Sequence, residues 1–339
     1  MCYRKRGNSN QQTMTTKVII QDMSSILHRS FTAISSLSRQ FSSSFSTGTM
    51  SSFDRLIRFR DAAGNSRFGE PKISSVSEFD EAVAKGTLEA TVFEGSSPFN
   101  VTPTSEAVKV QEVLPLLTVE DVPIVKCVGL NYIKHIQEGG RKPPPYPSIF
   151  IKPRASIAGY KEDIPIPKLA QDDQLDYEGE LTIVIGKTGK NIPKEKALEH
   201  IAGFVVANDV SARKWQRDPA FAGGVPQWCF SKGFDKFAPV GPLLVSPKIV
   251  GNAGNLQLQT IVNGEVRQDT NTNDLLFSTE EIVAFISQGT TLEAGTIIMT
   301  GTPAGVAMGM KEPKWLKNGD VIEVKIEELG SVKNKMVFE

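Results

Sequence analysis

Two glutamates separated by one residue, Glu178 and Glu180, stand at the head of an apolar, β-branched run that ends at Ile185. Because side chains alternate between the two faces of a strand, the two carboxylates share one face with Asp176 and Thr182. Oxygen-only ligands of this kind suit Mg²⁺, Mn²⁺ or Ca²⁺ better than zinc. The motif therefore favours a divalent metal site. Its alternative is a surface face that carries paired charges.

A third carboxylate, Asp209, follows the next apolar run, residues 204–208, which is also typical of a strand. A carboxylate at the end of a strand can reach a metal beside the neighbouring strand. Three such ligands leave open positions on an octahedral ion, which substrate oxygens can fill. We therefore expect a metal enzyme that acts on an oxygen-rich small molecule.

A titratable pair follows the predicted buried strand at residues 125–130. His135 and Glu138 are three residues apart, so their side chains meet if this segment is helical. A carboxylate beside an imidazole orients the ring and raises its basicity, which suits a general base. Glycines at 139–140 and prolines at 143–145 bracket the pair and suggest a lid over a site. The alternative is a surface helical turn with a chance glutamate.

Two further motifs are weaker. Residues 297–305 form an apolar run that opens into a glycine-rich turn, which could direct backbone N–H groups and the Thr302 hydroxyl toward an anion. The turn lacks the lysine of a phosphate loop, so nucleotide binding is not expected. Lys232, beside a glycine, could counter substrate charge or stabilise a developing enolate. A solvated surface lysine is the alternative.

Composition restricts the classes of partner. The 339 residues hold 38 Lys and Arg against 38 Asp and Glu, so the net charge is zero. This balance argues against nucleic acid or an anionic surface as a partner. No apolar run approaches the roughly 18 residues that a membrane-spanning helix needs. The three cysteines are widely spaced and fit neither a disulfide framework nor a paired-cysteine metal site.

Residues 1–52 have a different composition. They hold one acidic residue against six lysines and arginines, and serine is frequent. Apolar residues from Leu27 to Phe45 recur at three- and four-residue steps and would form one helical stripe. These features indicate a mitochondrial transit peptide, and hence a protein of the mitochondrial matrix. A disordered serine-rich tail is the alternative, and Met23 as well as Met1 could be the start.

The rest of the chain is predicted to be mainly β with some α. Residues 53–120 indicate a small β-rich subdomain with one helix at 77–85, and residues 121–339 indicate the catalytic domain. Many short strands with turn signals favour a β-sandwich or rolled sheet over a doubly wound sheet. Strands are expected at 54–59, 91–93, 109–114, 148–152, 181–185, 204–208, 243–245, 256–262, 297–300 and 321–326. Further helices are expected at 194–200 and 280–287, and a hairpin turn at 263–264.

Seven motifs together resemble the fumarylacetoacetate hydrolase family, over about residues 125–337 and in the family's order. They are V-G-L-N-Y-x-x-H-x-x-E at 128–138, F-x-K-P at 150–153, D-Y-E-G-E-L at 176–181, N-D-V-S-A-R at 208–213, S-K-G-F-D at 231–235, V-N-G-E at 262–265 and T-G-T-P-A-G-V at 300–306. The resemblance implies the mixed β-sandwich roll of the family's C-terminal domain. It also implies a homodimer and a bound Mg²⁺ or Mn²⁺.

The resemblance also assigns residue roles. The implied ligands of the metal are Glu178, Glu180 and Asp209. His135 with Glu138 becomes the first candidate for the proton shuttle and Lys232 the second, while Arg213 and Thr302 fall on substrate-contacting positions. Two departures, Lys214 after S-A-R and the segment 217–225, leave the choice of substrate open.

Within the family, the chain looks closest to mitochondrial members that convert enol-oxaloacetate to keto-oxaloacetate. The expected function is therefore a metal-dependent tautomerase for a small 2-oxo dicarboxylic acid. The alternative is an acylpyruvase or oxaloacetate decarboxylase, which would break a C–C bond with the same site. A catalytically silent binding protein is a third possibility, against which the intact ligand trio argues. Fumarylacetoacetase itself would need a larger N-terminal domain than residues 53–120 can supply.

Overall fold

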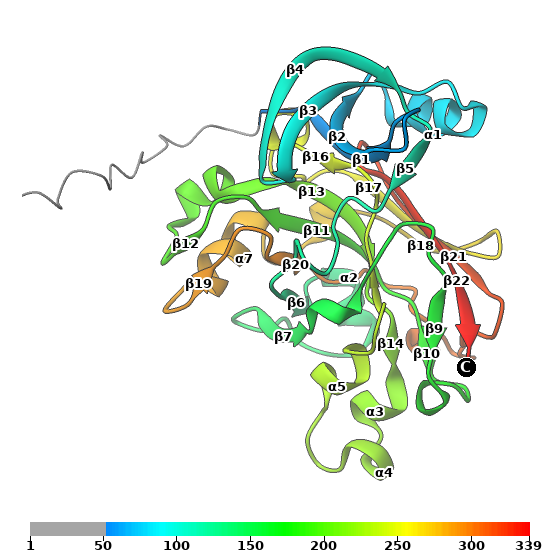
Figure 1. The fold of residues 1–339 in the computed structure, drawn as a ribbon. Coiled ribbons are helices and arrows are strands. Elements are labelled where there is room, and N and C mark those ends of the chain that lie inside the picture. Colours follow the sequence, from blue (N-terminus) through cyan, green and yellow to red (C-terminus); the bar gives the residue numbers. More distant parts are fainter. Residues whose placement is uncertain (1–51) are drawn as a thin grey trace, which may run out of the picture. The chain divides into compact units, whose positions relative to one another are not determined.

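The computed structural model describes residues 52–339, so the predicted transit peptide lies outside the described residues except for its last one (Figure 1). Most strands belong to two sheets. The larger sheet has the order β4 (Asn100–Lys109), β3 (Glu89–Ser97), β2 (Ser66–Pro71), β1 (Arg55–Arg60), β16 (Leu244–Val245), β13 (Ile201–Asn208), β11 (Gly179–Ile185), β20 (Ile297–Met299), β6 (Val125–Gly129) and β7 (Ser148–Lys152), with β5 (Glu112–Leu114) paired to β1. The second sheet has the order β18 (Glu265–Asn271), β17 (Gln257–Val262), β21 (Val321–Ile326), β22 (Gly330–Phe338) and β9 (Ile164–Ile166).

Shorter elements connect these sheets. Three two-stranded ladders join β10 (Leu175–Asp176) to β14 (Ser211–Ala212), β12 (Gly189–Lys190) to β19 (Thr291–Leu292), and β15 (Ala238–Pro239) to β8 (Ile157–Ala158). The α-helices are α1 (Val76–Lys85), α2 (Ile133–Glu138), α3 (Arg213–Arg217), α4 (Pro219–Ala222), α5 (Trp228–Lys232), α6 (Pro247–Val250) and α7 (Thr279–Ile286). The 3₁₀ turns are η1 (Arg154–Ser156), η2 (Lys168–Ala170), η3 (Lys194–His200), η4 (Thr272–Asp274) and η5 (Ala307–Gly309). In Figure 1, α3, α4 and α5 form a small helical group at the lower end of the molecule.

Strands β11 and β13 lie at the centre of the molecule. One face of this pair packs on β17, β21 and β22 of the second sheet, and this interface includes Leu181 and Ile183. The other face holds Val184 and Val205, which pack with residues of β6 and β20. Both strands are buried along their whole length. Because both faces are covered, their sequences are almost continuously apolar and do not alternate with polar residues.

The structure confirms the predicted fold class, a mainly β protein with two packed sheets and few helices. Two local predictions differ from it. The segment 194–200 forms the 3₁₀ turn η3 instead of an α-helix. The predicted strand 109–114 is divided, because β4 ends at Lys109 and β5 begins at Glu112 after a turn in which the backbone N–H of Val110 bonds to Leu88. The 263–264 turn does join β17 to β18, and both of its residues have positive φ.

The predicted N-terminal subdomain is continuous with the larger sheet. Strand β1 pairs with β2 and β5 of its own segment and also with β16 of the C-terminal part. Backbone hydrogen bonds between β1 and β16 thus cross the predicted boundary at residue 120. The division of the chain into two domains at that residue stays a prediction. Over residues 52–339, no helix is both long and apolar enough to cross a membrane.

Candidate metal-dependent active site

Three carboxylates meet where the paired strands β11 and β13 end. The register sets Gly179 opposite Asn208, so Glu178 and Asp209 lie side by side just beyond the ladder. The N–H of Asp209 donates to the backbone carbonyl of Glu178 at 2.8 Å. One carboxylate oxygen from each of Glu178, Glu180 and Asp209 lies within 4.8 Å of the others, and all three residues are buried. The structure thus brings together the trio that the sequence predicted as metal ligands.

Buried cations neutralise two of the three carboxylates. The Lys232 ammonium lies 2.7 Å from Glu178 Oε2 and 2.5 Å from Asp209 Oδ2. Arg213 Nη2 lies 2.5 Å from Glu178 Oε1. The ammonium of Lys152, whose side chain is fully buried, lies 2.5 Å from Asp209 Oδ1 and also donates to the carbonyl of Phe237. The lysine contacts are charge-assisted hydrogen bonds, and the contact between Arg213 and Glu178 is an ion pair.

Glu180 has a different environment. Its Oε2 accepts the N–H of Gly301 at 2.7 Å, and it forms no ion pair with any described side chain. Burial and the neighbouring carboxylates of Asp209 and Glu178 raise the pKa of Glu180 well above its usual value. Burial also disfavours the charge of Glu178, but Lys232 and Arg213 outweigh it and lower the pKa of Glu178 to about 2. A hard divalent cation would supply the positive partner charge that Glu180 lacks. The three carboxylates therefore fit Mg²⁺ or Mn²⁺.

The backbone of Gly301 makes this contact possible. Its φ of 101° lies in a region that residues with a side chain rarely adopt, and a Cβ there would stand 2.9 Å from the carbonyl oxygen of Val128. The predicted glycine-rich turn therefore exists, but its first N–H points to a protein carboxylate instead of a substrate anion. The Thr302 hydroxyl donates to Gly179 O and accepts a bond from Gln268 Nε2.

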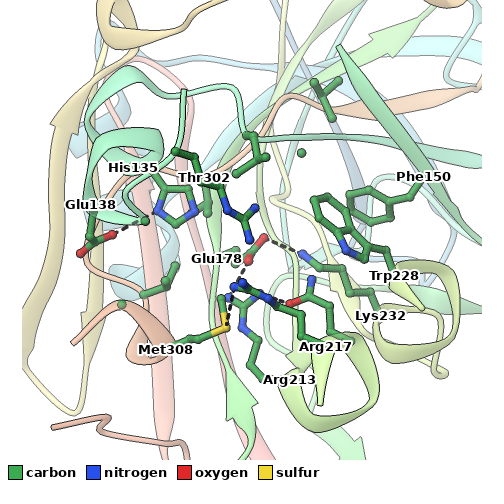
Figure 2. Close-up of a pocket in the computed structure, with 18 residues that line it drawn as sticks. His135, Glu138, Phe150, Glu178, Arg213, Arg217, Trp228, Lys232, Thr302 and Met308 are labelled. Carbon is green, nitrogen blue, oxygen red and sulfur yellow. Dashed lines mark hydrogen bonds and ion pairs between the residues drawn. The ribbon is translucent and has the colours of Figure 1, made fainter. Parts of the chain in front are cut away.

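A cavity of about 210 Å³ opens beside Glu178, one of the three carboxylates. It is smaller than the roughly 300–1,000 Å³ pockets that hold drug-sized ligands, so it suits a small molecule. Glu178, Arg213, Lys232 and Thr302 line its inner part. Figure 2 shows His135 and Glu138 on the wall that lies across from Lys232.

Helix α2 presents the His135–Glu138 pair to this cavity. His135 Nδ1 lies 3.2 Å from Glu138 Oε2, as the i, i+3 spacing predicts for a helical turn. The preceding Asn131 is fully buried, and its side chain donates to the carbonyl of Thr300 at 2.8 Å. Gly309, which also lines the cavity, leaves room for the Glu138 carboxylate, since a Cβ there would lie 2.8 Å from it. These contacts attach the predicted lid segment to the strand ends that carry the metal site.

Comparisons with known proteins identify the family of this chain. Residues 124–337 match the family model described as fumarylacetoacetate (FAA) hydrolase C-terminal. The chain belongs to the fumarylacetoacetate hydrolase family. It is 45% identical over 213 residues to the human protein named "Oxaloacetate tautomerase FAHD2A, mitochondrial", an alignment covering 63% of this chain and 66% of that one. It is 43% identical over 211 residues to the protein of Xenopus laevis named "Oxaloacetate tautomerase fahd2, mitochondrial", covering 62% and 64%. The chain thus spans slightly less than two thirds of these relatives.

Solved structures of the family share the fold. A 2-hydroxyhepta-2,4-diene-1,7-dioate isomerase from Mycobacterium marinum superposes with a TM-score of 0.68 at 31% identity, over 86% of this chain and 99% of that one. A fumarylpyruvate hydrolase from Pseudomonas aeruginosa, solved with Mn²⁺ and pyruvate, gives 0.57 at 32% identity, over 64% and 91%. The family therefore includes isomerases and hydrolases on one architecture.

Asp176 does not share a strand with Glu180, contrary to the alternation expected from sequence, and Glu178 lies between their two strands. Asp176 lies in β10, separate from β11. Its carboxylate accepts the N–H groups of Ala307 and Met308 and the Nε–H of Arg213 at 2.9 Å. Asp176 thus orients Arg213, the predicted substrate contact, and anchors the turn after β20. Lys214, a departure from the family pattern, is not among the residues that line the cavity and donates to the carbonyl of Asp172.

Sequence reasoning gave no role to several residues of this family member's site. Lys152 belongs to the F-x-K-P motif, whose single lysine in an apolar strand was the available signal. Trp228 covers Gly129, where a Cβ would stand 2.0 Å from the indole ring, and packs edge-on against Phe150. Arg141 and Arg217 also line the cavity. The roles of all these residues, and of the predicted site residues, stay predictions.

Replacing Glu180 tests the metal site without breaking an ion pair. We expect Glu180→Gln to stay folded, because the residue has no cationic partner among the described side chains, and to bind Mn²⁺ at least about tenfold more weakly. Electron paramagnetic resonance of free Mn²⁺, with thermal unfolding in parallel, measures both properties. Glu138→Gln, which makes the same substitution at a carboxylate outside the trio, is the matched control and should change the affinity less than about twofold. Equal Mn²⁺ affinity in Glu180→Gln and the unaltered protein would contradict the three-carboxylate site.

Proposed function

We propose that this chain is a metal-dependent tautomerase that converts enol-oxaloacetate to keto-oxaloacetate. The observation that supports it best is the arrangement of the cavity, with the His135–Glu138 pair on one wall and the buried carboxylate of Glu178 beside the Lys232 ammonium on the other. A keto–enol exchange needs one group that moves a proton to or from carbon and a second group that stabilises the enolate. The names of the relatives point to the same reaction.

His135 is the group suited to move the proton. With Glu138 accepting the proton of Nδ1, the other ring nitrogen, Nε2, is free to take a proton from substrate carbon and return it. The tautomer is assigned from this hydrogen bond. His135 lies across the cavity from Lys232 (Figure 2), and its ring bonds to Glu138.

Lys232 is suited to stabilise charge instead. Burial disfavours its ammonium, but the carboxylates of Asp209 and Glu178 outweigh this and raise the pKa of Lys232 above its ordinary value. It therefore remains protonated at neutral pH and serves as a fixed cation. A divalent ion held by Glu178, Glu180 and Asp209 would add Lewis-acid stabilisation of negative charge on a substrate oxygen. Arg213, fixed by Asp176, supplies a further cation beside it.

The alternative is cleavage of a C–C bond in an acylpyruvate, or decarboxylation of oxaloacetate. The family member solved with pyruvate and Mn²⁺ is named as a hydrolase of fumarylpyruvate, which keeps this alternative open. Hydrolysis needs a water placed against the second carbonyl, and decarboxylation needs the distal carboxylate free to leave. Tautomerisation needs neither of these.

The reaction is tested by following two signals together in the purified protein with Mg²⁺. We expect the absorbance of enol-oxaloacetate to decay much faster than pyruvate appears. His135→Ala should slow the decay by about 10²–10⁴-fold if His135 shuttles the proton. His200→Ala is the control, since that histidine bonds to the carbonyl of Lys187 and is not among the residues that line the cavity. Pyruvate formed as fast as the enol disappears would instead establish the decarboxylase.

We also propose that the protein acts in the mitochondrial matrix. The support is the acid-poor, arginine- and serine-rich composition of residues 1–52 and the mitochondrial names of its relatives. A chain that begins at Ser52 should keep its activity yet stay in the cytosol, as seen by fluorescence microscopy of tagged cells. Replacing Arg29 and Arg39 with glutamate in the full chain should also block import. A mitochondrial location for the shortened chain would contradict the proposal.

A homodimer completes the proposal. Strand β7 ends the larger sheet, so one of its edges pairs with no strand of residues 52–339, and its residues Ile149 and Ile151 are 40% and 45% exposed. Phe230 of α5, 46% exposed, lies in the same surface groove as Ile149. An unpaired apolar edge of this kind favours association with a second copy of the chain.

Light scattering tests the dimer directly. The purified protein should have twice the mass of one chain, and Ile151→Lys should shift it toward the monomer because a charge then enters the apolar edge. Val266→Lys, at an exposed position of β18, is the matched control and should leave the mass unchanged. A monomer at all concentrations would refute the dimer.

A further inference from the structure

Two arginines in the cavity have no acidic partner. The cavity lining holds two carboxylates, Glu178 and Glu138. Glu178 pairs with Lys232 and Arg213, and Glu138 pairs with His135. The remaining lining cations, Arg141 and Arg217, form no ion pair with any residue of the described chain. The cavity lining therefore carries two positive charges, on Arg141 and Arg217, that no described carboxylate neutralises.

The surroundings of Arg217 are unusual for an arginine. Its guanidinium donates to the sulfur of Met308, a weak acceptor that lies 3.7 Å from Nη1 (Figure 2). Burial together with the positive charges of Arg141 and Arg213 lowers the pKa of Arg217. These guanidinium groups thus repel one another across the cavity. An anion placed between Arg141 and Arg217 would remove this repulsion and satisfy their donors.

The spacing along α3 gives the position of this anion site. Arg213 and Arg217 are four residues apart and therefore lie on one face of the helix, one turn apart. Arg213 contacts Glu178 at the floor of the cavity, so Arg217 lies one turn, about 5.4 Å, further along α3. A four-carbon diacid separates its two carboxyl carbons by roughly 4 Å. Arg141 follows the lid helix α2, and its N–H bonds to the carbonyl of Ile136 in that helix.

We propose that Arg141 and Arg217 form a clamp that binds the distal carboxylate of a four-carbon 2-oxo diacid. The reactive end of the ligand lies at Glu178 and Lys232, and the distal end lies between the two guanidinium groups. Their planar forks match the geometry of a carboxylate. The clamp selects diacids over 2-oxo acids that end in an uncharged group. It rests on the proposed function in that it takes oxaloacetate as the ligand.

A matched pair of ligands tests the clamp. Oxaloacetate and 2-oxobutyrate both have four carbons and the same 2-oxo acid head, but the first ends in a carboxylate and the second in a methyl group. Calorimetry with Mg²⁺ measures binding of each to the full-length protein and to Arg141→Gln and Arg217→Gln. We expect each variant to bind oxaloacetate about tenfold or more weakly than the unaltered protein. Its affinity for 2-oxobutyrate should fall by less than about twofold.

Two further variants separate the clamp from general effects. Lys214→Gln removes a positive charge from the same helix without touching the cavity, and it should leave both affinities unchanged. Arg217→Lys keeps the charge but loses the fork, so its affinity for oxaloacetate should fall between those of Arg217→Gln and the unaltered protein. Equal weakening of both ligands, or no change for oxaloacetate, overturns the clamp.

The same measurements distinguish this inference from the proposed reaction. If the variants lose oxaloacetate selectively while the unaltered protein fails to accelerate enol decay, the clamp stands and the tautomerase proposal fails. If enol decay is fast and both Arg141→Gln and Arg217→Gln bind oxaloacetate with unchanged affinity, the reaction stands and the clamp fails.

Discussion

The buried cluster of charged side chains at the ends of β11 and β13 is the constraint on which the site depends. An ionised carboxylate removed from water costs several kcal/mol unless an opposite charge and hydrogen bonds compensate it. Glu178 and Asp209 are compensated by Lys152, Lys232 and Arg213, which come from β7, α5 and α3. These elements are far apart in the sequence, so the charge balance exists only when the strand edge and the helical group are both in place. Binding chemistry and folding are thus coupled through one cluster.

In the same cluster, Glu180 has no cationic partner among the described side chains. Its contact with the Gly301 N–H orients the carboxylate without neutralising it, and burial with two neighbouring carboxylates raises the pKa of Glu180. A fully paired cluster would have no need of a further cation. The unpaired carboxylate is what makes the strand ends a candidate metal site instead of a purely structural network of ion pairs.

Much of the site could be predicted because its residues are local in the sequence. Alternation along one strand placed Glu178 beside Glu180, and a single helical turn brought His135 to Glu138. Asp209 could be added because it ends the neighbouring strand. Prediction failed where the backbone departs from its regular period. Asp176 leaves the strand before Glu178, and the Gly301 turn directs its N–H inward, since the positive φ of that glycine is not visible in a motif.

The sequence by itself determined the fold class, the family and the identity of the paired carboxylates, because each depends on short-range periodicity or on ordered motifs. The tertiary structure decided which charges are neutralised and which are left over. Lys152 resembles any strand lysine until the fold buries it against Asp209. Arg141 and Arg217 line one cavity although they are 76 positions apart in the sequence. The fold places the segment after the lid helix and helix α3 beside the same cavity. Electrostatic balance is a sum over neighbours in space, and a linear sequence does not specify those neighbours.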